Sequence, residues 1–371
     1  MYKGTGISKD QLSDDGEPCI LYGELYTKYK SETIREVISK TNIDNTKLVR
    51  SKANDVIIPC SGETAEDIAT ARCVLNGNIL LGGDLNIIRL HGYDGAFMSY
   101  QLNGRRKYDI AKVAQGVSVV HLYGEHLKGV KTINPCLEEQ KKIASLLALL
   151  DERISTQNKI IEDLKKLKSA IIENVFDDKH SERLQLDNVG SYIRGLTYSS
   201  NDVVEHGGTL VMRSNNIVNG SLLDYNNNVV FVNKQMSAEQ QLQNGDVVIC
   251  MANGSSSLVG KSSFYDGSCH SPITVGAFCG IYRSKEPIVK WLFQTNKYRR
   301  YIWNSLQGGN GAIANLNGED ILNMSFSIPN ATIKDTCVKM LTSVDSALEN
   351  NMSLCALYTL QKQHLLRLMF I

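Results

Sequence analysis

The feature that most constrains this chain is an uninterrupted helical pattern from Pro135 to Phe176. No further Pro and no Gly occurs within it. Its apolar residues recur in steps of three and four, the pattern of a helix that packs along another helix: Ile143, Leu147, Leu150, Ile154, Ile161, Leu164, Ile171 and Val175. At about 1.5 Å per residue, such a helix reaches roughly 55–60 Å, longer than a small domain is wide. The pattern therefore predicts a spacer between globular parts.

A second stretch of the same character, from Cys337 to Phe370, supplies a partner helix. The two stretches are copies at a constant shift of 194 positions (329 − 135), which aligns Pro135 with Pro329, Leu147 with Leu341, Asp151 with Asp345, Ile154 with Leu348 and Phe176 with Phe370. Gln157 and Lys168 interrupt the first apolar pattern, and polar residues at such positions can set the register of a helix pair at some cost in stability. The chain is therefore interpreted as a tandem duplication.

Each copy is expected to be one globular region of mixed short strands and helices, followed by one long helix. The predicted boundaries are 1–134 and 178–328 for the globular regions, and 135–177 and 329–371 for the helices. Strand patterns include Asp55–Pro59 and Asp246–Cys250, and helical patterns cover 97–114 and 289–306. The second copy begins with residues 184–190, which have no counterpart ahead of Tyr2. The first domain is therefore expected to lack its opening strand.

Composition restricts the class of protein further. The chain is 42% hydrophobic, and it has no apolar run near the ~20 residues that a membrane span requires. The N-terminus lacks the apolar core of a signal peptide. Nine cysteines without a Cys-x-x-Cys spacing indicate reduced thiols. These features predict a soluble protein of the cytoplasm with no membrane partner.

Charge gives a weaker indication. The net charge of +1 is not typical of a nucleic-acid-binding protein. Basic clusters nevertheless occupy corresponding places in the two copies, each a few residues ahead of a Gln-Gly pair. They are Arg105, Arg106, Lys107 and Lys112 in the first copy, and Lys290, Lys297, Arg299 and Arg300 in the second. Solvated surface helices and phosphate contact explain these clusters equally well.

Residues for catalysis are not evident. The glycine-rich stretches Gly82-Gly83-Asp84 and Gly308–Gly311 are not followed by Lys-Ser/Thr, so neither predicts a phosphate loop. The seven histidines are scattered without the spacing of metal ligands. Asn134-Pro135-Cys136-Leu137 lacks the second Pro and the aromatic residue of an amino-methyltransferase motif, and a helix start explains it. The chain is expected to catalyse nothing by itself and to bind no cofactor or metal.

The function class that remains is recognition of a ligand by polar loops. Arg can read guanine, Asn can read adenine, and small hydroxyls and backbone N–H groups suit phosphate. The candidate DNA-binding residues are Tyr26, Thr27, Lys28, Ser61, Gly62, Thr64, Arg105, Arg106 and Gln115 in the first copy, and Arg213, Asn215, Asn216, Asn253, Ser255, Gln307 and Asn310 in the second. For any one of them, ordinary loop chemistry is at least as good an explanation.

These residues resemble a known family, the specificity (S) subunits of type I restriction–modification systems. The string Pro135-x-Leu137-x-Glu139-Gln140-x-x-Ile143-x-x-x-Leu147-x-x-x-Asp151-x-x-Ile154 is similar to that family's helical region. Segments similar to a target-recognition domain are Gly16-x-Pro18-x-Ile20, Gly23–Thr27, Asp55–Pro59, Ser61–Thr64, Gly82–Asp84 and Gln115-Gly116. The second copy departs from the helical string, with Ala331, Ile333 and Lys334 at the places of Leu137, Glu139 and Gln140.

The resemblance implies an α+β protein with two tandem target-recognition domains and two long helices, which pack as an antiparallel coiled coil with pseudo-twofold symmetry. Each domain would read one half of a bipartite double-stranded DNA target, and the helices would set the unread gap. The helices would dock two modification subunits that carry S-adenosylmethionine and methylate adenine N6. Two restriction subunits, with ATP and Mg, are optional further partners. The helix-pairing and docking residues would be Glu139, Gln140, Ile143, Leu147, Asp151, Ile154, Leu341, Asp345 and Leu348.

Other functions stay open from the sequence. One is an inactive or silent specificity copy, suggested by the short first domain. Another is a free-standing DNA-binding protein without methylation partners. A fused methyltransferase–specificity enzyme is disfavoured, because the chain has neither a cofactor loop nor a catalytic motif.

Overall fold

The computed structural model describes residues 1–44, 47–116, 118–176, 182–307 and 314–370. Contacts divide the chain into two compact units. Unit 1 is Met1–Lys159 together with Met352–Ile371, and unit 2 is Ile160–Asn351. Each unit therefore combines one globular region with parts of both long helices.

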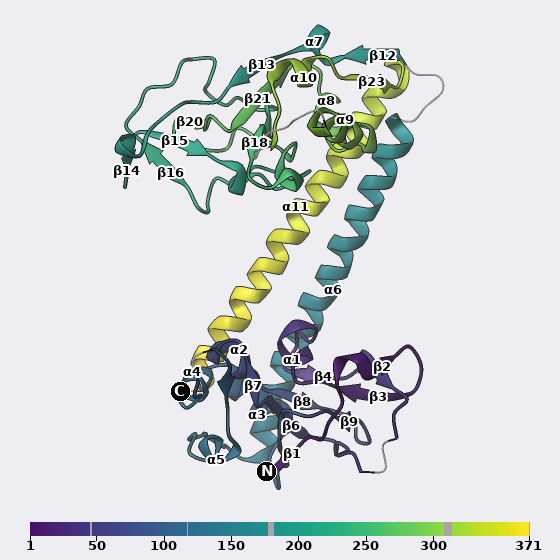
Figure 1. The fold of residues 1–371 in the computed structure, drawn as a ribbon, viewed down its shortest axis with the longest axis vertical. Helices are drawn as coiled ribbons and strands as arrows, with labels where there is room; N and C mark the ends of the chain where they lie inside the picture. The colour runs from purple at the N-terminus through teal and green to yellow at the C-terminus, as the bar shows by residue number, and fades with distance from the viewer. Residues whose placement is uncertain (45–46, 117, 177–181, 308–313, 371) are drawn as a thin grey trace. The chain divides into compact units, whose positions relative to one another are not determined.

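The long helices are α6 (Leu137–Phe176) and α11 (Ala331–Leu368), drawn in teal and yellow in Figure 1. Each begins two residues after a proline, Pro135 or Pro329, so the proline stands just ahead of the helix without interrupting its hydrogen bonds. Glu138 and Glu139 lie in the first turn of α6, where negative charge is favourable. Helix α6 lies within the stretch that the apolar periodicity predicts, and α11 begins six residues ahead of the predicted stretch Cys337–Phe370.

The two helices are antiparallel within each unit. In unit 1, Ala144 and Leu147 near the start of α6 share an apolar cluster with Phe370 and Leu366 at the end of the chain. In unit 2, Ile172 near the end of α6 shares a cluster with Leu341 near the start of α11. The predicted fold class is confirmed: short strands and helices in each copy, with long helices that pair in opposite directions.

The described residues of the globular region of unit 1 form two mixed sheets and one short strand pair. The five-stranded sheet has the order β1 (Tyr2–Lys3), β10 (Leu85–Ile88), β6 (Asp55–Pro59), β8 (Arg72–Val74), β4 (Thr33–Ile34). The four-stranded sheet has the order β2 (Leu12–Ser13), β5 (Ser39–Thr41), β3 (Glu17–Ile20), β9 (Leu80–Leu81). The separate pair is β7 (Ser61–Gly62) with β11 (Val120–His121).

The helices of this region are short: η1 (Lys9–Gln11), α1 (Glu24–Thr27), α2 (Ala65–Ile68), α3 (Gly95–Asn103), α4 (Lys107–Lys112) and α5 (Gly124–Leu127). The helical pattern predicted over 97–114 is real but broken into α3 and α4. Gly104 is the C-cap of α3, and glycine suits the end of a helix.

In unit 2, the part of the globular region that the structure describes forms two four-stranded sheets and two short strand pairs. The sheets have the orders β13 (Gly190–Arg194), β21 (Cys279–Ser284), β17 (Val247–Cys250), β19 (Ser262–Phe264) and β14 (Val203–Val204), β16 (Val230–Val232), β15 (Thr209–Met212), β20 (Ile273–Val275). The pairs are β18 (Ala252–Asn253) with β22 (Ala314–Asn315), and β12 (Glu182–Gln185) with β23 (Ser325–Ile328). The helices are α7 (Leu186–Val189), η2 (Ser200–Asp202), η3 (Ser214–Asn216), η4 (Ser256–Leu258), α8 (Val289–Leu292), α9 (Asn296–Gln307) and α10 (Gly318–Leu322).

The duplication is visible in buried ion pairs as well as in strand order. Asp55 at the start of β6 binds Arg89 at 2.8 Å. Asp246, just ahead of β17, binds Arg283 on β21 at 2.7 Å. Both aspartates are almost fully buried, and β6–β10 and β17–β21 are both antiparallel. Within the described residues of unit 1, the β12–β23 pair has no counterpart.

Two expectations about the chain as a whole can be compared with this structure. In its described part, no helix is both long enough and apolar enough to cross a bilayer. All nine cysteines are free thiols.

Candidate nucleic-acid interface

In unit 1 the candidate loop residues gather around the β7–β11 pair. Ser61 pairs with His121 and Gly62 with Val120. The backbone N–H of Gln115 donates to the His121 carbonyl at 2.9 Å, and the Gln115 carbonyl accepts from the His121 N–H at 2.7 Å. The structure therefore brings Ser61, Gly62 and Gln115 together, although they are far apart in the sequence.

Tyr26 joins the same site. Gly62 lies so close to Tyr26 that a Cβ at this glycine would be 3.7 Å from the tyrosine hydroxyl oxygen. Burial raises the pKa of the Tyr26 phenol, and the nearby Tyr22, Asp67 and Glu63 raise it further. Tyr26 is thus a neutral phenol at physiological pH, able to donate and accept hydrogen bonds.

Three other candidates of unit 1 have local hydrogen bonds. The Thr27 hydroxyl donates to the Gly23 carbonyl at 2.7 Å, and the Lys28 ammonium binds Glu24 at 2.6 Å. Thr64 caps α2, its hydroxyl oxygen accepting from the Asp67 N–H at 3.1 Å. These bonds account for ordinary loop and helix chemistry, which the sequence left as the alternative to DNA contact.

In unit 2 the corresponding strand pair, β18–β22, joins two candidate loops. The Asn253 amide donates to the Ser214 hydroxyl at 3.2 Å, and Asn253 Oδ1 accepts from the Ser255 N–H at 3.0 Å. The loop Arg213–Asn216 therefore contacts the loop Asn253–Ser257. Arg213 and Asn215 are exposed on this joined surface, where a ligand can reach them.

Asn216 is buried, whereas a residue that reads DNA bases is expected to be exposed. Its side chain is fully buried. Its Oδ1 accepts from the Arg213 N–H at 2.9 Å, and its Nδ2 donates to the carbonyls of Asp224 and Asn227 at 3.0 and 2.7 Å. In this structure the amide holds the loop in shape, and it presents no group to a ligand.

The basic candidates also include one exposed side chain and one that is mostly buried. Arg105 is exposed. The Arg106 side chain is only 17% exposed and lies 3.5 Å from Asp109, and its buried Nε has no hydrogen-bond partner within the described part of the chain. Gln307 ends α9, and Asn310 lies outside the described residues.

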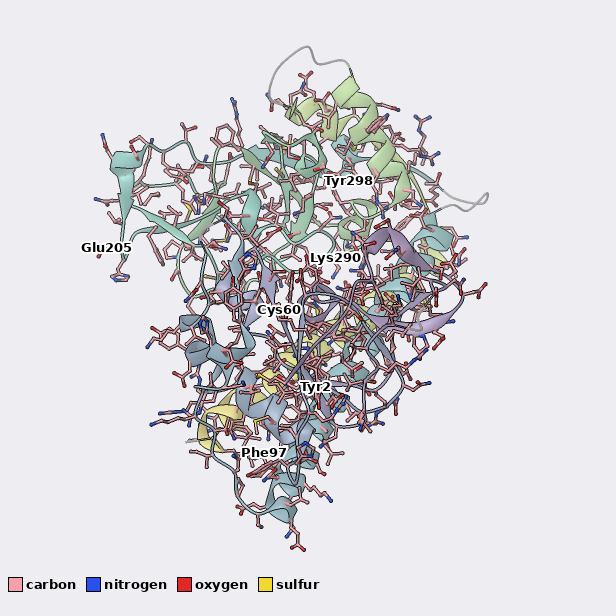
Figure 2. The ribbon with its side chains drawn as sticks, turned by 60° about the horizontal axis from the view of Figure 1, so that its bottom comes forward. Tyr2, Cys60, Phe97, Glu205, Lys290 and Tyr298 are labelled. Carbon is pink, nitrogen blue, oxygen red and sulfur yellow. The ribbon has the colours of Figure 1, made fainter. Side chains whose placement is uncertain are left out.

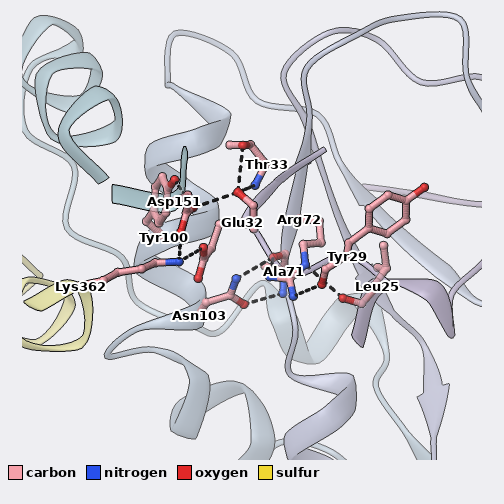
Figure 3. A network of polar contacts seen from close by, with 11 residues as sticks. Leu25, Tyr29, Glu32, Thr33, Ala71, Arg72, Tyr100, Asn103, Asp151 and Lys362 are labelled. Carbon is pink, nitrogen blue, oxygen red and sulfur yellow. Dashed lines mark hydrogen bonds and ion pairs between the residues drawn. The ribbon is translucent and has the colours of Figure 1, made fainter. Parts of the chain in front are cut away.

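The helix residues form a polar network in unit 1, shown in Figure 3. The Lys362 ammonium of α11 lies 2.5 Å from both the Glu32 and the Asp151 carboxylates. Asp151 on α6 also accepts from the Tyr100 hydroxyl at 2.7 Å and from the Ser31 hydroxyl at 2.9 Å. One carboxylate thus joins both long helices to the globular region.

Burial governs the ionisation of this network. It raises the pKa of the Glu32 carboxyl, an effect that the Lys362 charge opposes and the Asp151 charge reinforces. It also raises the pKa of the Tyr100 phenol. It lowers the pKa of Arg72, whose guanidinium donates to the carbonyls of Leu25 and Tyr29.

Unit 2 repeats the arrangement with the two helices in exchanged roles: the lysine is on α6 and the aspartate is on α11. Lys168 on α6 lies 2.6 Å from Asp345 on α11, and the indole N–H of Trp291 donates to Asp345 at 3.0 Å. Lys290, labelled in Figure 2, approaches the same carboxylate at 3.5 Å. Lys168 and Lys362 are related by the shift of 194 positions (362 − 168), as are Asp151 and Asp345. Each aspartate therefore receives a lysine from the helix of the other copy.

The sequence indicated part of this network. Lys168 was evident as a break in the apolar pattern, and the repeat shift could have identified Lys362. Glu32, Tyr100 and Trp291 gave no signal, because their contact with a helix depends on how the domain folds over it.

The remaining helix residues vary in exposure. Leu147 and Leu341 are fully buried and Leu348 is 8% exposed, whereas Ile143 and Ile154 are half-buried and Glu139 is exposed. Gln140 is buried, and its amide joins the Asp94 N–H to the Pro135 carbonyl at 2.9 and 2.7 Å. No group of three or more potential metal ligands occurs among the residues that the structure describes.

Comparison with known proteins gives a consistent result. No family model matches the sequence. The chain is 34% identical over 155 residues to the type I restriction enzyme EcoKI specificity subunit of Escherichia coli (strain K12), a match that covers 39% of this chain and 31% of that subunit. It is 27% identical over 156 residues to the MjaVIII specificity subunit of Methanocaldococcus jannaschii, covering 42% and 35%. The matches span about a third of the length of these curated relatives.

A solved structure matches the whole chain. The crystal structure of the type I restriction–modification S subunit from M. genitalium aligns with a TM-score of 0.66 at 16% identity, covering 100% of this chain and 93% of that one. The chain has the fold of a type I S subunit. The resemblance found in the sequence is therefore confirmed. Each unit of this S-subunit fold carries one strand pair with candidate loops and one lysine–aspartate helix contact.

Proposed function

We propose that this chain is the DNA specificity subunit of a type I system and reads a bipartite double-stranded DNA target. The observation that carries the proposal is the repeated site: β7–β11 gathers polar loops in unit 1, and β18–β22 does so in unit 2. Exposed Arg213 and Asn215 are the residue types that read guanine and adenine in a major groove. Each unit would read one half-site, and the spacing of the units would leave a gap unread.

The long helices are proposed to dock two adenine-N6 methyltransferase subunits. Each long helix buries one face against the globular regions, and apolar side chains remain exposed on its other faces. In unit 1 these are Leu137, Leu146, Leu149, Met352, Leu354, Leu357, Leu360 and Leu368, and in unit 2 they are Ile160, Leu167, Ile333 and Met340. Large exposed apolar side chains along one element are typical of a protein-binding surface.

The chemistry would belong to the partners. Modification subunits would supply S-adenosylmethionine, and optional restriction subunits would supply ATP and Mg. This chain would act as a non-catalytic subunit that selects the DNA sequence.

The test is co-expression of the chain with its neighbouring modification-subunit candidate, followed by single-molecule sequencing of methylated adenines in the host DNA. Methylation at two short specific sequences around a fixed gap is the expected result. Assembly without methylation would favour an inactive specificity copy. Failure to assemble, with DNA binding retained, would favour a free-standing DNA-binding protein.

The spacer role has its own test. Inserting about four residues, roughly one helical turn, at the same level of α6 and α11 should alter the gap between the half-sites and leave both half-sites unchanged. A methylome in which a half-site changes instead would contradict the proposal that the helices set the distance between the half-sites.

A further inference from the structure

We propose that one helix of each unit presents an exposed aromatic side chain flanked by cations, Tyr108 in unit 1 and Trp303 in unit 2, as a contact surface for the DNA backbone. The inference rests on the proposed function for its ligand. It adds a second type of contact, independent of base sequence, beside the loops that would read the bases.

In unit 1 the surface belongs to α4. The Tyr108 side chain is 68% exposed, and the Lys112 ammonium lies 4.3 Å from the centre of its ring. Tyr108 and both lysines of α4 line an open pocket of about 570 Å³ beside α2, together with Ala65, Glu66, Asn103, Gly104 and Ala111. The pocket is therefore bordered by the short helix that directly follows the candidate loop Ser61–Thr64.

The link between this helix and the candidate site is direct packing. Helix α4 contacts α2, and α2 contacts both strands of the β7–β11 pair. The N-cap of α2 is Thr64, itself a candidate DNA-binding residue. A duplex that reaches the loops of this pair would thus meet a neighbouring helix that carries the exposed Lys112 and the half-buried Lys107, while the Asp109 carboxylate of the same helix faces Arg106 at 3.5 Å.

In unit 2 the surface belongs to α9. One side of this helix packs into the unit: the Tyr298 hydroxyl donates to the Gly260 carbonyl at 2.8 Å, and a Cβ on Gly260 would lie 2.7 Å from the Ile302 side chain. Tyr298 is labelled in Figure 2. Gly260, with φ +80°, lies two residues after the end of η4 (Ser256–Leu258), which overlaps the candidate loop Asn253–Ser257. Helix α9 is therefore packed against the loop region, as α4 is packed against α2.

The other side of α9 is exposed. Trp303 follows Arg299 by four residues and Arg300 by three, all three side chains are exposed, and Trp303 is 66% exposed. The helix carries three cations, at Lys297, Arg299 and Arg300, and its sequence from Asn296 to Gln307 contains no Asp or Glu. A large aromatic side chain exposed beside cations, on a helix without acidic residues of its own, matches a polyanion with apolar sugar rings, which is the surface of a DNA strand.

The exposed aromatic ring distinguishes this surface from the proposed protein-docking faces. The exposed apolar residues of the long helices named above are Leu, Ile and Met, as suits an apolar partner, although Lys165 and Lys166 are also exposed on α6. The surfaces on α4 and α9 combine a ring with cations, so their occupant is DNA. Contacts of this kind position a protein on the duplex without reading sequence, because every phosphate is alike.

Trp303 provides the experiment. The chain has two tryptophans, and the other, Trp291, is fully buried. Adding an arbitrary double-stranded DNA of about 40 base pairs to the full chain should quench the fluorescence of exposed Trp303. The Trp303→Phe variant, which retains only Trp291, should lose that quenching.

A salt titration tests the cations. Arg299→Gln with Arg300→Gln should weaken binding to every duplex alike and reduce the slope of log affinity against log salt by about two. Lys165→Gln with Lys166→Gln removes the same charge from the exposed face of α6 and should leave the slope unchanged. The corresponding variants of unit 1 are Lys107→Gln with Lys112→Gln, and Tyr108→Ala.

Several results would overturn the proposal. If the parent binds DNA and the arginine variant keeps its salt slope, the surface does not contact the backbone, while the proposed function stands. If the variant instead loses its modification subunit with DNA binding intact, the surface binds protein. If neither the full chain nor its complex with the modification subunit binds DNA, the proposed function and this inference both fail.

Discussion

The buried carboxylate of Asp345 allows a quantitative prediction about what holds the helices in register. Its side chain is 7% exposed and faces Lys168 at 2.6 Å, which is itself 8% exposed. In Asp345→Asn, the new amide can still accept from the Trp291 indole, so the change removes charge with little change of shape. It leaves the Lys168 ammonium buried with the Gly220 carbonyl, at 2.7 Å, as its remaining acceptor. Removing one partner of a buried ion pair costs about 3–5 kcal/mol.

The reciprocal change should cost less. In Lys168→Met, Asp345 keeps the Trp291 hydrogen bond and the Lys290 ammonium at 3.5 Å. The double variant removes both charges of the closest pair, so its loss of stability should be smaller than the sum of the two single losses. The coupling energy from this double-mutant cycle is expected to be about 2–3 kcal/mol.

Trp291 reports the unfolding of unit 2. In a Trp303→Phe background it is the remaining tryptophan, and urea titration of its fluorescence at constant pH gives the free energy of unfolding. The control is Lys166→Met, which breaks the exposed pair with Glu162 on the same helix and should change nothing measurable. An Asp345→Asn variant within 1 kcal/mol of its parent, or additive single losses, would refute the reasoning.

Three further predictions concern other residues. Because burial raises the Glu32 pKa above its ordinary 4.5, the parent should lose stability as pH rises from 4.5 through the raised value. Glu32→Gln removes this loss, so the stability of the variant relative to the parent should rise with pH in circular-dichroism unfolding; a flat difference would contradict it. Leu147→Asp should destabilise unit 1 by more than about 3 kcal/mol in urea unfolding, and Leu146→Asp, at an exposed neighbour, should not. Asn216→Ala should cost about 1–3 kcal/mol, since two carbonyls lose their donor, and equal stability in urea would show that the amide does not hold the loop.

The position of the long helices was predictable because the signal is local and periodic. Apolar steps of three and four, with no interior Pro or Gly, specify a helix whatever surrounds it. Repetition at a fixed shift then implies two like units. Lys168 was recognisable as an exception to the pattern. Asp345 was named among the helix-pairing residues, but its ion pair with Lys168 was not predictable, since that contact exists only when the helices are antiparallel and in one register.

The roles of the loop residues, by contrast, were not predictable from the sequence. Asn215 and Asn216 are neighbours with the same amide chemistry, yet one is exposed and the other is buried with its hydrogen bonds satisfied inside the loop. An amide that can read adenine can equally bind a carbonyl of its own chain.

By itself, then, the sequence determined the helices, the duplication and the resemblance to S subunits, because periodicity and repeats are properties of the chain. Only the tertiary structure decided which polar side chains are exposed, which are buried with their hydrogen bonds made inside the protein, and which lysine pairs with which aspartate. The lysine–aspartate pairs depend on contacts between residues more than a hundred positions apart, and the loop amides depend on which of them the folded loop buries.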